Sequence, residues 1–180
     1  MNYVKIDNCN MNNGTGLRVV VWFSYCKFHC KNCFNVETQD KNYGDEFTEE
    51  QINYIKEYLN KDWCSGITFS GGDPMWQSSE DIESLIELCN YTHSIIKDVW
   101  IWTGFTFEEI MQYGKSNEEL SNEELARRKL LSCCDILVDG RYVDEQRDLT
   151  LKWRGSSNQR VIDVPDSLKR KQVVLLRREN

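Results

Sequence analysis

The chain has 180 residues, of which 40% are apolar, and a formal net charge of −7. This length suits one hydrophobic core, so we expect a single domain over residues 1–180. The acidic charge argues against nucleic acid as a partner, because binding to phosphates requires a surplus of Lys and Arg. No apolar run approaches the roughly 20 residues that span a bilayer. Nothing at the N-terminus resembles a secretory signal, and we expect a cytoplasmic protein with no membrane partner.

Strands and helices are predicted to alternate along the chain. The first strand is a β-branched and aromatic run of the length of a buried strand, and later apolar runs have the same character. Between these runs, Ser and Thr residues precede apolar positions at helical spacing, as N-caps do. The predicted strands are 17–23, 67–69, 99–102 and 136–138, and the predicted caps are Thr48, Ser78 and Thr106. This alternation indicates an α/β fold with a mostly parallel sheet.

Each predicted strand ends in an unusual motif. The loops after the carboxyl ends of parallel strands form the functional sites of such folds. The motifs are Cys26–Cys33, Ser70–Pro74, Thr103–Gly104 and Asp139–Gly140, in strand order. Because the four strand ends share one edge of the sheet, we expect the four motifs to form one site.

Three cysteines of the first motif, Cys26, Cys30 and Cys33, have the spacing C-x3-C-x2-C. A 4Fe-4S cluster normally takes four thiolates, one for each iron, so three leave one iron with an open position. A zinc site that adds His29 is an alternative, although zinc ligands usually come as two separated pairs. A disulfide framework is disfavoured because no secretory signal is seen. The other cysteines form no second ligand spacing and are expected to be structural: Cys9, Cys64, Cys89, Cys133 and Cys134.

The cysteine spacing resembles the cluster loop of radical S-adenosylmethionine (SAM) enzymes, in which the methionine end of SAM chelates the fourth iron. The turn Gly71-Gly72-Asp73-Pro74 resembles their GGE methionine-binding motif, with Asp73 in place of Glu. The resemblance implies a single-domain partial (βα) barrel of the radical SAM type. It also implies a 4Fe-4S cluster and SAM as cofactors, with Cys26, Cys30 and Cys33 as the metal ligands and catalytic residues. The SAM-binding residues that it implies are Asn32, Cys33, Phe34, Gly71, Gly72 and Asp73.

Two positions depart from the radical SAM pattern. Many such loops have an aromatic residue before the third cysteine, where this chain has Asn32, so we expect Phe34 to pack on the adenine side. Tyr25 stands where the family often has Gly. At Gly72, a Cβ would block close backbone approach to SAM without touching the thiolates, so we expect Gly72→Val to weaken SAM binding and spare the iron.

Six motifs together narrow the resemblance. They are Asn13–Arg18, the cysteine segment through Asn35, Ser70–Pro74, Ile101–Phe105, Val138–Tyr142 and Trp153–Gln159. In this order they look like the family of activating proteins of the anaerobic (class III) ribonucleoside-triphosphate reductase, over most of the chain. This family implies a radical SAM oxidoreductase that cleaves SAM reductively to a 5′-deoxyadenosyl radical and generates a glycyl radical on the reductase. It also implies a one-electron donor such as flavodoxin or ferredoxin.

Other functions stay open on the sequence. One is a radical SAM enzyme that acts on a small molecule, similar to 7-carboxy-7-deazaguanine synthase, and another is the activase of a different glycyl-radical enzyme. A third is a non-catalytic cysteine-rich module that holds zinc or a four-ligand cluster. The role of 154–159 is also open, because these residues suit either a turn that pins the C-terminal segment or a docking site for the partner.

Overall fold

The computed structural model describes residues 1–177 and contains one seven-stranded sheet. Its strand order is β3-β1-β2-β4-β5-β6-β7. The strands are β1 (Asn2–Asn10), β2 (Leu17–Phe23), β3 (Asp45–Glu46), β4 (Cys64–Gly71), β5 (Asp98–Trp102), β6 (Ile136–Asp139) and β7 (Arg160–Asp163). Residues 178–180 of the predicted domain lie outside the described part, and the single domain stays a prediction.

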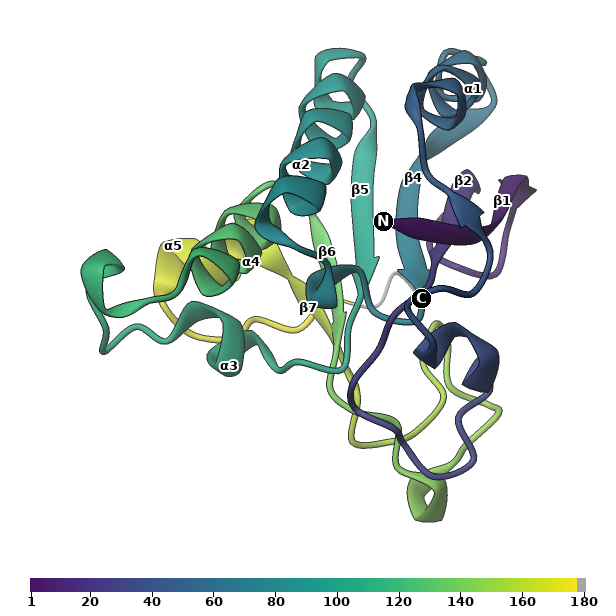
Figure 1. Ribbon diagram of the computed structural model, residues 1–180. Helices are drawn as coiled ribbons and strands as arrows, with labels where there is room; N and C mark the ends of the chain where they lie inside the picture. Colours follow the sequence, from purple (N-terminus) through teal and green to yellow (C-terminus); the bar gives the residue numbers. More distant parts are fainter. Residues whose placement is uncertain (178–180) are drawn as a thin grey trace.

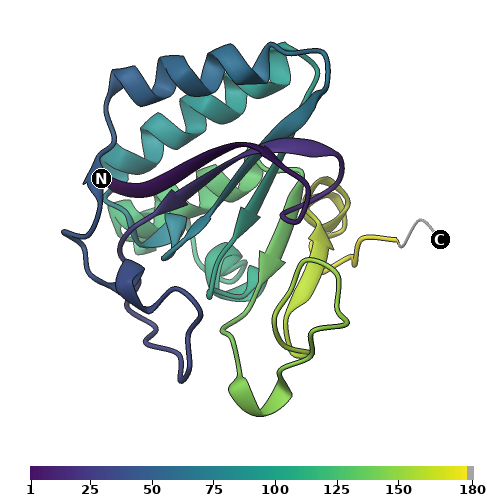
Figure 2. The ribbon, with the colours of Figure 1, turned by 90° about the vertical axis from the view of Figure 1, so that its right-hand side faces the viewer.

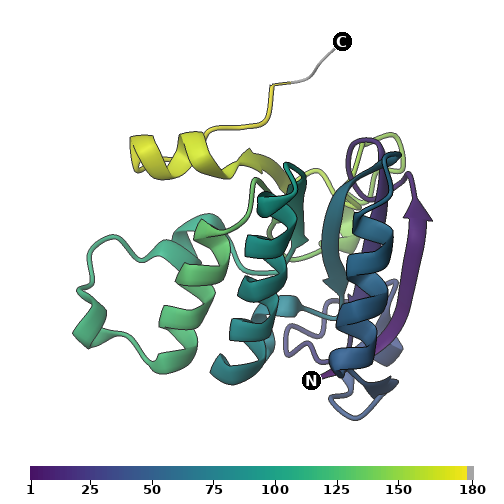
Figure 3. The same cartoon turned by 90° about the horizontal axis from the view of Figure 1, so that it is seen from above.

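The four predicted strands are β2, β4, β5 and β6, and they form the parallel centre of the sheet. Their order in space is their order along the chain. Because crossovers between parallel strands are right-handed, this order places the connecting helices on one face. Figure 3 shows α1, α2 and α4 side by side along that face. The α/β class and the mostly parallel centre are therefore confirmed.

The predicted caps begin helices where expected. Thr48 and Thr106 form capping boxes, and the Ser78 hydroxyl accepts from the N–H of Asp81. The helices are α1 (Glu49–Leu59), α2 (Ser79–Ser94), α3 (Phe107–Met111), α4 (Asn122–Ser132) and α5 (Val164–Arg170). Short 3-10 turns are η1 (Val36–Gln39), η2 (Pro74–Trp76), η3 (Asn117–Glu119) and η4 (Asp144–Gln146). Within residues 1–177, no helix has both the length and the apolar character needed to cross a membrane.

Alternate residues of the central strands face opposite sides of the sheet, as the two-residue period of a strand requires. One set, which includes Val19, Val21 and Phe69, packs with the helices in the main core. The opposite face carries Trp100 and Val138, against which Trp153 packs. Trp153 therefore covers part of the face of the sheet opposite α1, α2 and α4.

The sheet has antiparallel edges that the sequence did not predict. β1 pairs with β2, and β7 pairs with β6, both antiparallel. β1 is half-exposed and rich in polar residues, and β7 has four residues, so neither has the apolar run of a buried strand. The curvature of a partial barrel stays a prediction.

The carboxyl ends of β2, β4, β5 and β6 lie along one edge of the sheet, which we call the rim. The strand register aligns Phe23 with Gly71 and Trp102 with Val138. Below this edge in Figures 1 and 2 hang two long loops, one from residues 24–44 and one from residues 140–159. The four motifs predicted to form one site are therefore gathered at the rim.

Candidate metal and cofactor site

The segment Cys26–Cys33, the cysteine loop, begins three residues after β2 ends. Its three thiols are half-buried, and none is in a disulfide. Tyr25, His29 and Asn32 have positive φ angles of 80°, 48° and 54°. Left-handed backbone is uncommon outside glycine, so the loop depends on its neighbours to hold this shape.

On one side, the cysteine loop is held by the turn η1. The Tyr25 N–H donates to the carbonyl of Thr38 at 2.6 Å, and the Cys26 N–H donates to that of Gln39 at 3.5 Å. The Gln39 side chain also contacts His29 Nδ1 at 2.8 Å. Residues of η1, which follow the cysteine loop in the chain, therefore hold the start of that loop.

On the other side, the Gly71-Gly72 turn at the end of β4 packs on the residues that lead into the cysteine loop. The Gly72 N–H donates to the Phe23 carbonyl at 2.7 Å, and the Asp73 N–H donates to the Tyr25 carbonyl at 2.9 Å. A Cβ on Gly72 would lie 2.6 Å from the Thr38 oxygen and 2.9 Å from the Tyr25 oxygen. Only glycine therefore fits between the turn and the loop at this position.

The carboxylate of Asp73 joins the loops that follow β4 and β5. It accepts from the Thr103 hydroxyl at 2.8 and 2.9 Å, from the Gly104 N–H at 2.8 Å and from the Met75 N–H at 2.9 Å. The side chain is fully buried. Burial raises the pKa of Asp73 to about 6, although the donors around it favour the charged form. Its oxygens are thus occupied by protein donors, and direct contact with the SAM amino group stays a prediction.

Aromatic rings pack against the cysteine loop on its inner side. Phe28, between the first two cysteines, lies 4.8 Å from Phe105 and 5.5 Å from Trp76 between ring centroids. A Cβ on Gly104 would lie 2.4 Å from the Phe28 ring. The guanidinium of Arg127 lies over both Trp76 and Phe105. The sequence predicted that the loops after β2 and β5 share one site, but not that Phe28 packs against Gly104, because that contact depends on how the folded loops pack.

The protein environment disfavours free thiolates at two of the three cysteines. Burial raises the pKa of Cys26 to about 12, and the nearby charge of Asp73 adds to the shift. Burial also raises the pKa of Cys30, while the main-chain N–H of Tyr142 and the charge of Arg141 act in the opposite direction. A bound cation reverses this preference, because it stabilises the thiolate directly. A metal bound at this site would therefore favour the thiolate form of the cysteines.

This donor set fits a 4Fe-4S cluster, whose thiolates bind different irons and need not meet at one point. A zinc ion with Cys26, Cys30, Cys33 and His29 would require four ligands around one ion. Within residues 1–177, no three His, Cys, Asp or Glu side chains converge in that way. The two SAM-binding candidates between and after the cysteines lie at the surface: Asn32 donates to Asp144 at 2.7 Å, and Phe34 is 97% exposed.

The remaining cysteines lie away from the cysteine loop. Cys64, Cys89 and Cys134 are buried in the main core, and Cys133 packs against it. Cys9 is exposed on β1. The burial of Cys64, Cys89 and Cys134 suits a structural role, which stays a prediction for all five cysteines.

Comparison with known proteins gives two results. Residues 12–162 match the family described as 4Fe-4S single cluster domain. A protein of enterobacteria phage T4 named anaerobic ribonucleoside-triphosphate reductase-activating protein is 34% identical over 171 residues, which are 93% of this chain and 97% of the relative. Proteins with the same name from Vibrio cholerae and Escherichia coli K12 are 32% and 33% identical, over 88% of this chain and 96% of each relative.

Proposed function

The chain belongs to the 4Fe-4S single cluster domain family and to the anaerobic ribonucleoside-triphosphate reductase-activating proteins, and we propose that it is a radical SAM activase of that reductase. It is an enzyme that activates a glycyl-radical enzyme. The observation that carries this function is that the Gly71-Gly72 turn is bonded at the rim to Phe23 and Tyr25, which lead directly into the three-cysteine loop. Such a rim offers a metal ligand set and an adjacent backbone surface for a cofactor.

Cys26, Cys30 and Cys33 would hold the cluster, one thiolate for each of three irons. When bound and reduced, the cluster supplies the electron that cleaves SAM to methionine and a 5′-deoxyadenosyl radical. The protein's own share is binding and orientation. The main chain of Gly71 and Gly72 would face the methionine end of SAM, and Asp73 holds that turn in place through Thr103 and Gly104.

Asn32, Cys33 and Phe34 would contact SAM from the cysteine loop. The exposed Phe34 ring offers a flat apolar surface of the kind on which an adenine can pack. The substrate is a glycine-bearing segment of the reductase, and a donor such as flavodoxin or ferredoxin supplies the electron. A sheet curved into a partial barrel would place these groups on its concave side.

The test is transfer of the radical to the reductase. We expect the reduced, cluster-loaded protein with SAM to install a glycyl radical on an anaerobic ribonucleotide reductase. Electron paramagnetic resonance (EPR) should show a carbon-centred doublet that collapses toward a singlet when the reductase carries deuterated glycine. Cys30→Ala should abolish both the radical and SAM cleavage, whereas Cys9→Ala, at an exposed cysteine of β1, should leave both unchanged.

Two results would overturn this function. One is a reductase that stays radical-free while the protein cleaves SAM in the presence of a small-molecule substrate. The other is a preparation that binds one zinc ion per chain and no iron, which would support a cysteine-rich module.

A further inference from the structure

Three side chains of the Trp153–Gln159 segment bind the main chain of the loop after β6. Gln159 Nε2 donates to the Gly140 carbonyl at 2.9 Å, and Asn158 Nδ2 donates to the Arg141 carbonyl at 2.8 Å. The Ser156 hydroxyl accepts from the Val143 N–H at 3.2 Å. We call Ser156, Asn158 and Gln159 the brace, and residues 140–148 the β6 loop. Side-chain bonds to successive main-chain groups fix the backbone path of residues 140–143, which belong to no strand or helix.

The brace is itself anchored to the sheet. Gln159 Oε1 accepts from the N–H groups of Gly155 at 2.9 Å and Ser156 at 3.2 Å. The Trp153 ring lies 4.9 Å from that of Trp100 on β5, and its Nε1 donates to the Gly14 carbonyl at 3.1 Å. The position of the brace is therefore set by the packed face of the sheet.

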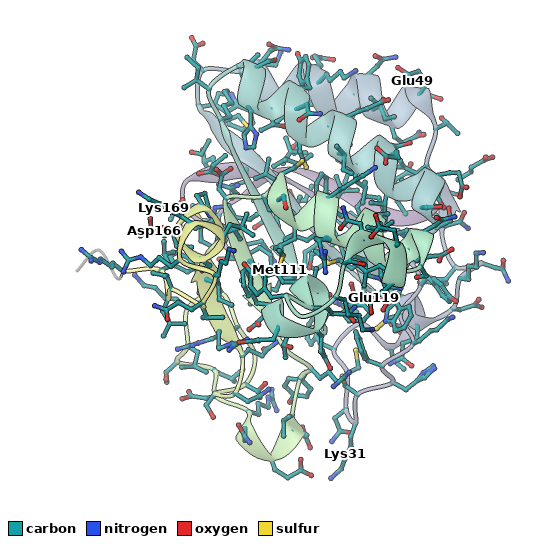
Figure 4. All side chains as sticks on the ribbon, turned by 90° about the vertical axis from the view of Figure 1, so that its left-hand side faces the viewer. Lys31, Glu49, Met111, Glu119, Asp166 and Lys169 are labelled. Carbon is teal, nitrogen blue, oxygen red and sulfur yellow. The ribbon has the colours of Figure 1, made fainter. Side chains whose placement is uncertain are left out.

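The β6 loop in turn contacts the cysteine loop. Lys31 pairs with Glu145 at 2.8 Å, and Figure 4 shows Lys31 at the lower end of the molecule, close to the β6 loop. Asn32 donates to Asp144 at 2.7 Å. The guanidinium of Arg141 lies 4.5 Å from the centre of the Phe28 ring. These contacts reach residues 28, 31 and 32 of the cysteine loop, whereas η1 contacts residues 25, 26 and 29.

The cysteine loop needs support from its surroundings. His29 and Asn32 have positive φ angles, and such conformations cost on the order of 1–3 kcal/mol each unless the surroundings enforce them. The guanidinium of Arg141 lies over the Phe28 ring, two residues before Cys30. A cation near the ligand sulfurs stabilises the more negative, reduced state of a cluster and so raises its potential.

We infer that Ser156, Asn158 and Gln159 are positioning residues that hold the β6 loop against the cysteine loop, so that the cation of Arg141 stays beside Phe28 and raises the potential of the cluster. The inference rests on the proposed cluster and assigns the segment a role inside the protein rather than in partner docking. Gln159 and Asn158 act through the backbone of the β6 loop and touch neither metal nor substrate.

The first test uses the metal-free protein and hydrogen exchange measured by mass spectrometry. Gln159→Glu keeps the acceptor for Gly155 and loses the donor to Gly140, and Asn158→Ala loses the donor to Arg141. We expect about tenfold faster exchange in peptides covering 26–35 as well as 140–148. Asn90→Ala, which removes an exposed amide on α2, should change neither peptide. Faster exchange confined to 140–148, or none, would overturn the inference.

The second test is an anaerobic redox titration of the cluster-loaded protein followed by EPR. Gln159→Glu, Asn158→Ala and Arg141→Gln should each shift the midpoint potential to more negative values, with iron content close to that of the wild type. An unchanged potential in all three variants would contradict the inference. The result is independent of the reductase, because a protein that fails to activate the reductase still reports the potential of its cluster and the exchange rates of its loops.

Discussion

Asp73 connects the loops that follow β4 and β5 through one buried carboxylate. Its neighbour Gly72 connects the β4 turn to the cysteine loop by close backbone packing. Two adjacent residues therefore hold the rim together, Asp73 by hydrogen bonds to its carboxylate and Gly72 by close backbone packing. Each makes a separate prediction.

For Gly72, the structure changes the expectation drawn from the sequence. An added Cβ would press on the backbone of Tyr25 and Thr38, which shape the entry to the cysteine loop. We therefore expect Gly72→Ala to lower iron retention as well as SAM binding, measured as iron per chain and by equilibrium binding of SAM. Gly114→Ala is the matched control, because a Cβ there meets nothing within 4 Å. Full iron content in Gly72→Ala would instead support the expectation from the sequence, in which a substitution at Gly72 weakens SAM binding and spares the iron.

For Asp73, the raised pKa predicts a pH dependence of folding. The native state holds the proton more tightly, since the pKa is about 6 compared with 3.8 for a free Asp. This stability is fully present below pH 3.8 and is lost as the pH rises through 6, with a total of about 3 kcal/mol. Between pH 4 and 7, the metal-free wild type should lose about this free energy of unfolding relative to Asp73→Asn. If the free energies of unfolding of the two proteins changed in parallel with pH, the pKa of Asp73 would not be raised in the native state.

At the level of the secondary-structure elements, one buried arginine connects three parallel strands at the end of the sheet opposite the rim. Arg18 of β2 donates from Nε to the Thr68 hydroxyl at 2.9 Å and from Nη2 to the Ile67 carbonyl at 2.9 Å, both on β4. It also pairs with Asp98 at the start of β5 and donates to the Thr15 carbonyl at 2.9 Å. The side chain is fully buried, and its removal would take a hydrogen-bond donor from each of these partners.

We expect Arg18→Leu to lower the free energy of unfolding by about 3–5 kcal/mol, because a buried hydrogen-bonded charge is lost. Denaturant unfolding measures this effect. Lys129→Leu is the comparison, since Lys129 forms an exposed pair with Glu83 and should change stability by less than about 1 kcal/mol. Equal losses of unfolding free energy in the two variants would show that the Arg18 contacts do not stabilise the packing of the strands.

At the scale of the molecule, the hydrophobic core and the proposed metal site are separate. The main core packs the sheet against α1, α2 and α4, and within residues 1–177 it includes no residue of the cysteine loop. Small domains that fold only around zinc lack such a core. Folding and metal binding should therefore be separable in this protein.

Removal of the metal by a chelator should leave the far-ultraviolet circular dichroism spectrum nearly unchanged. Hydrogen exchange should accelerate in 24–35 and stay slow in β4 and β5. Air exposure should release iron with the same pattern, because the three thiols are only half-buried at the rim. A cooperative loss of secondary structure on chelation would show instead that the metal is part of the core.

The sequence by itself determined the features that depend on neighbouring residues. The spacing of Cys26, Cys30 and Cys33 fixes three thiols in one short loop, the caps at Thr48 and Thr106 act within one helical turn, and apolar runs mark the four central strands. Only the tertiary structure decided which way Asp73 points, that Gly104 lies beneath Phe28, and that Gln159 holds the β6 loop. These contacts join residues about 20 to 80 positions apart, and their geometry follows from strand register and loop packing, which no local pattern encodes.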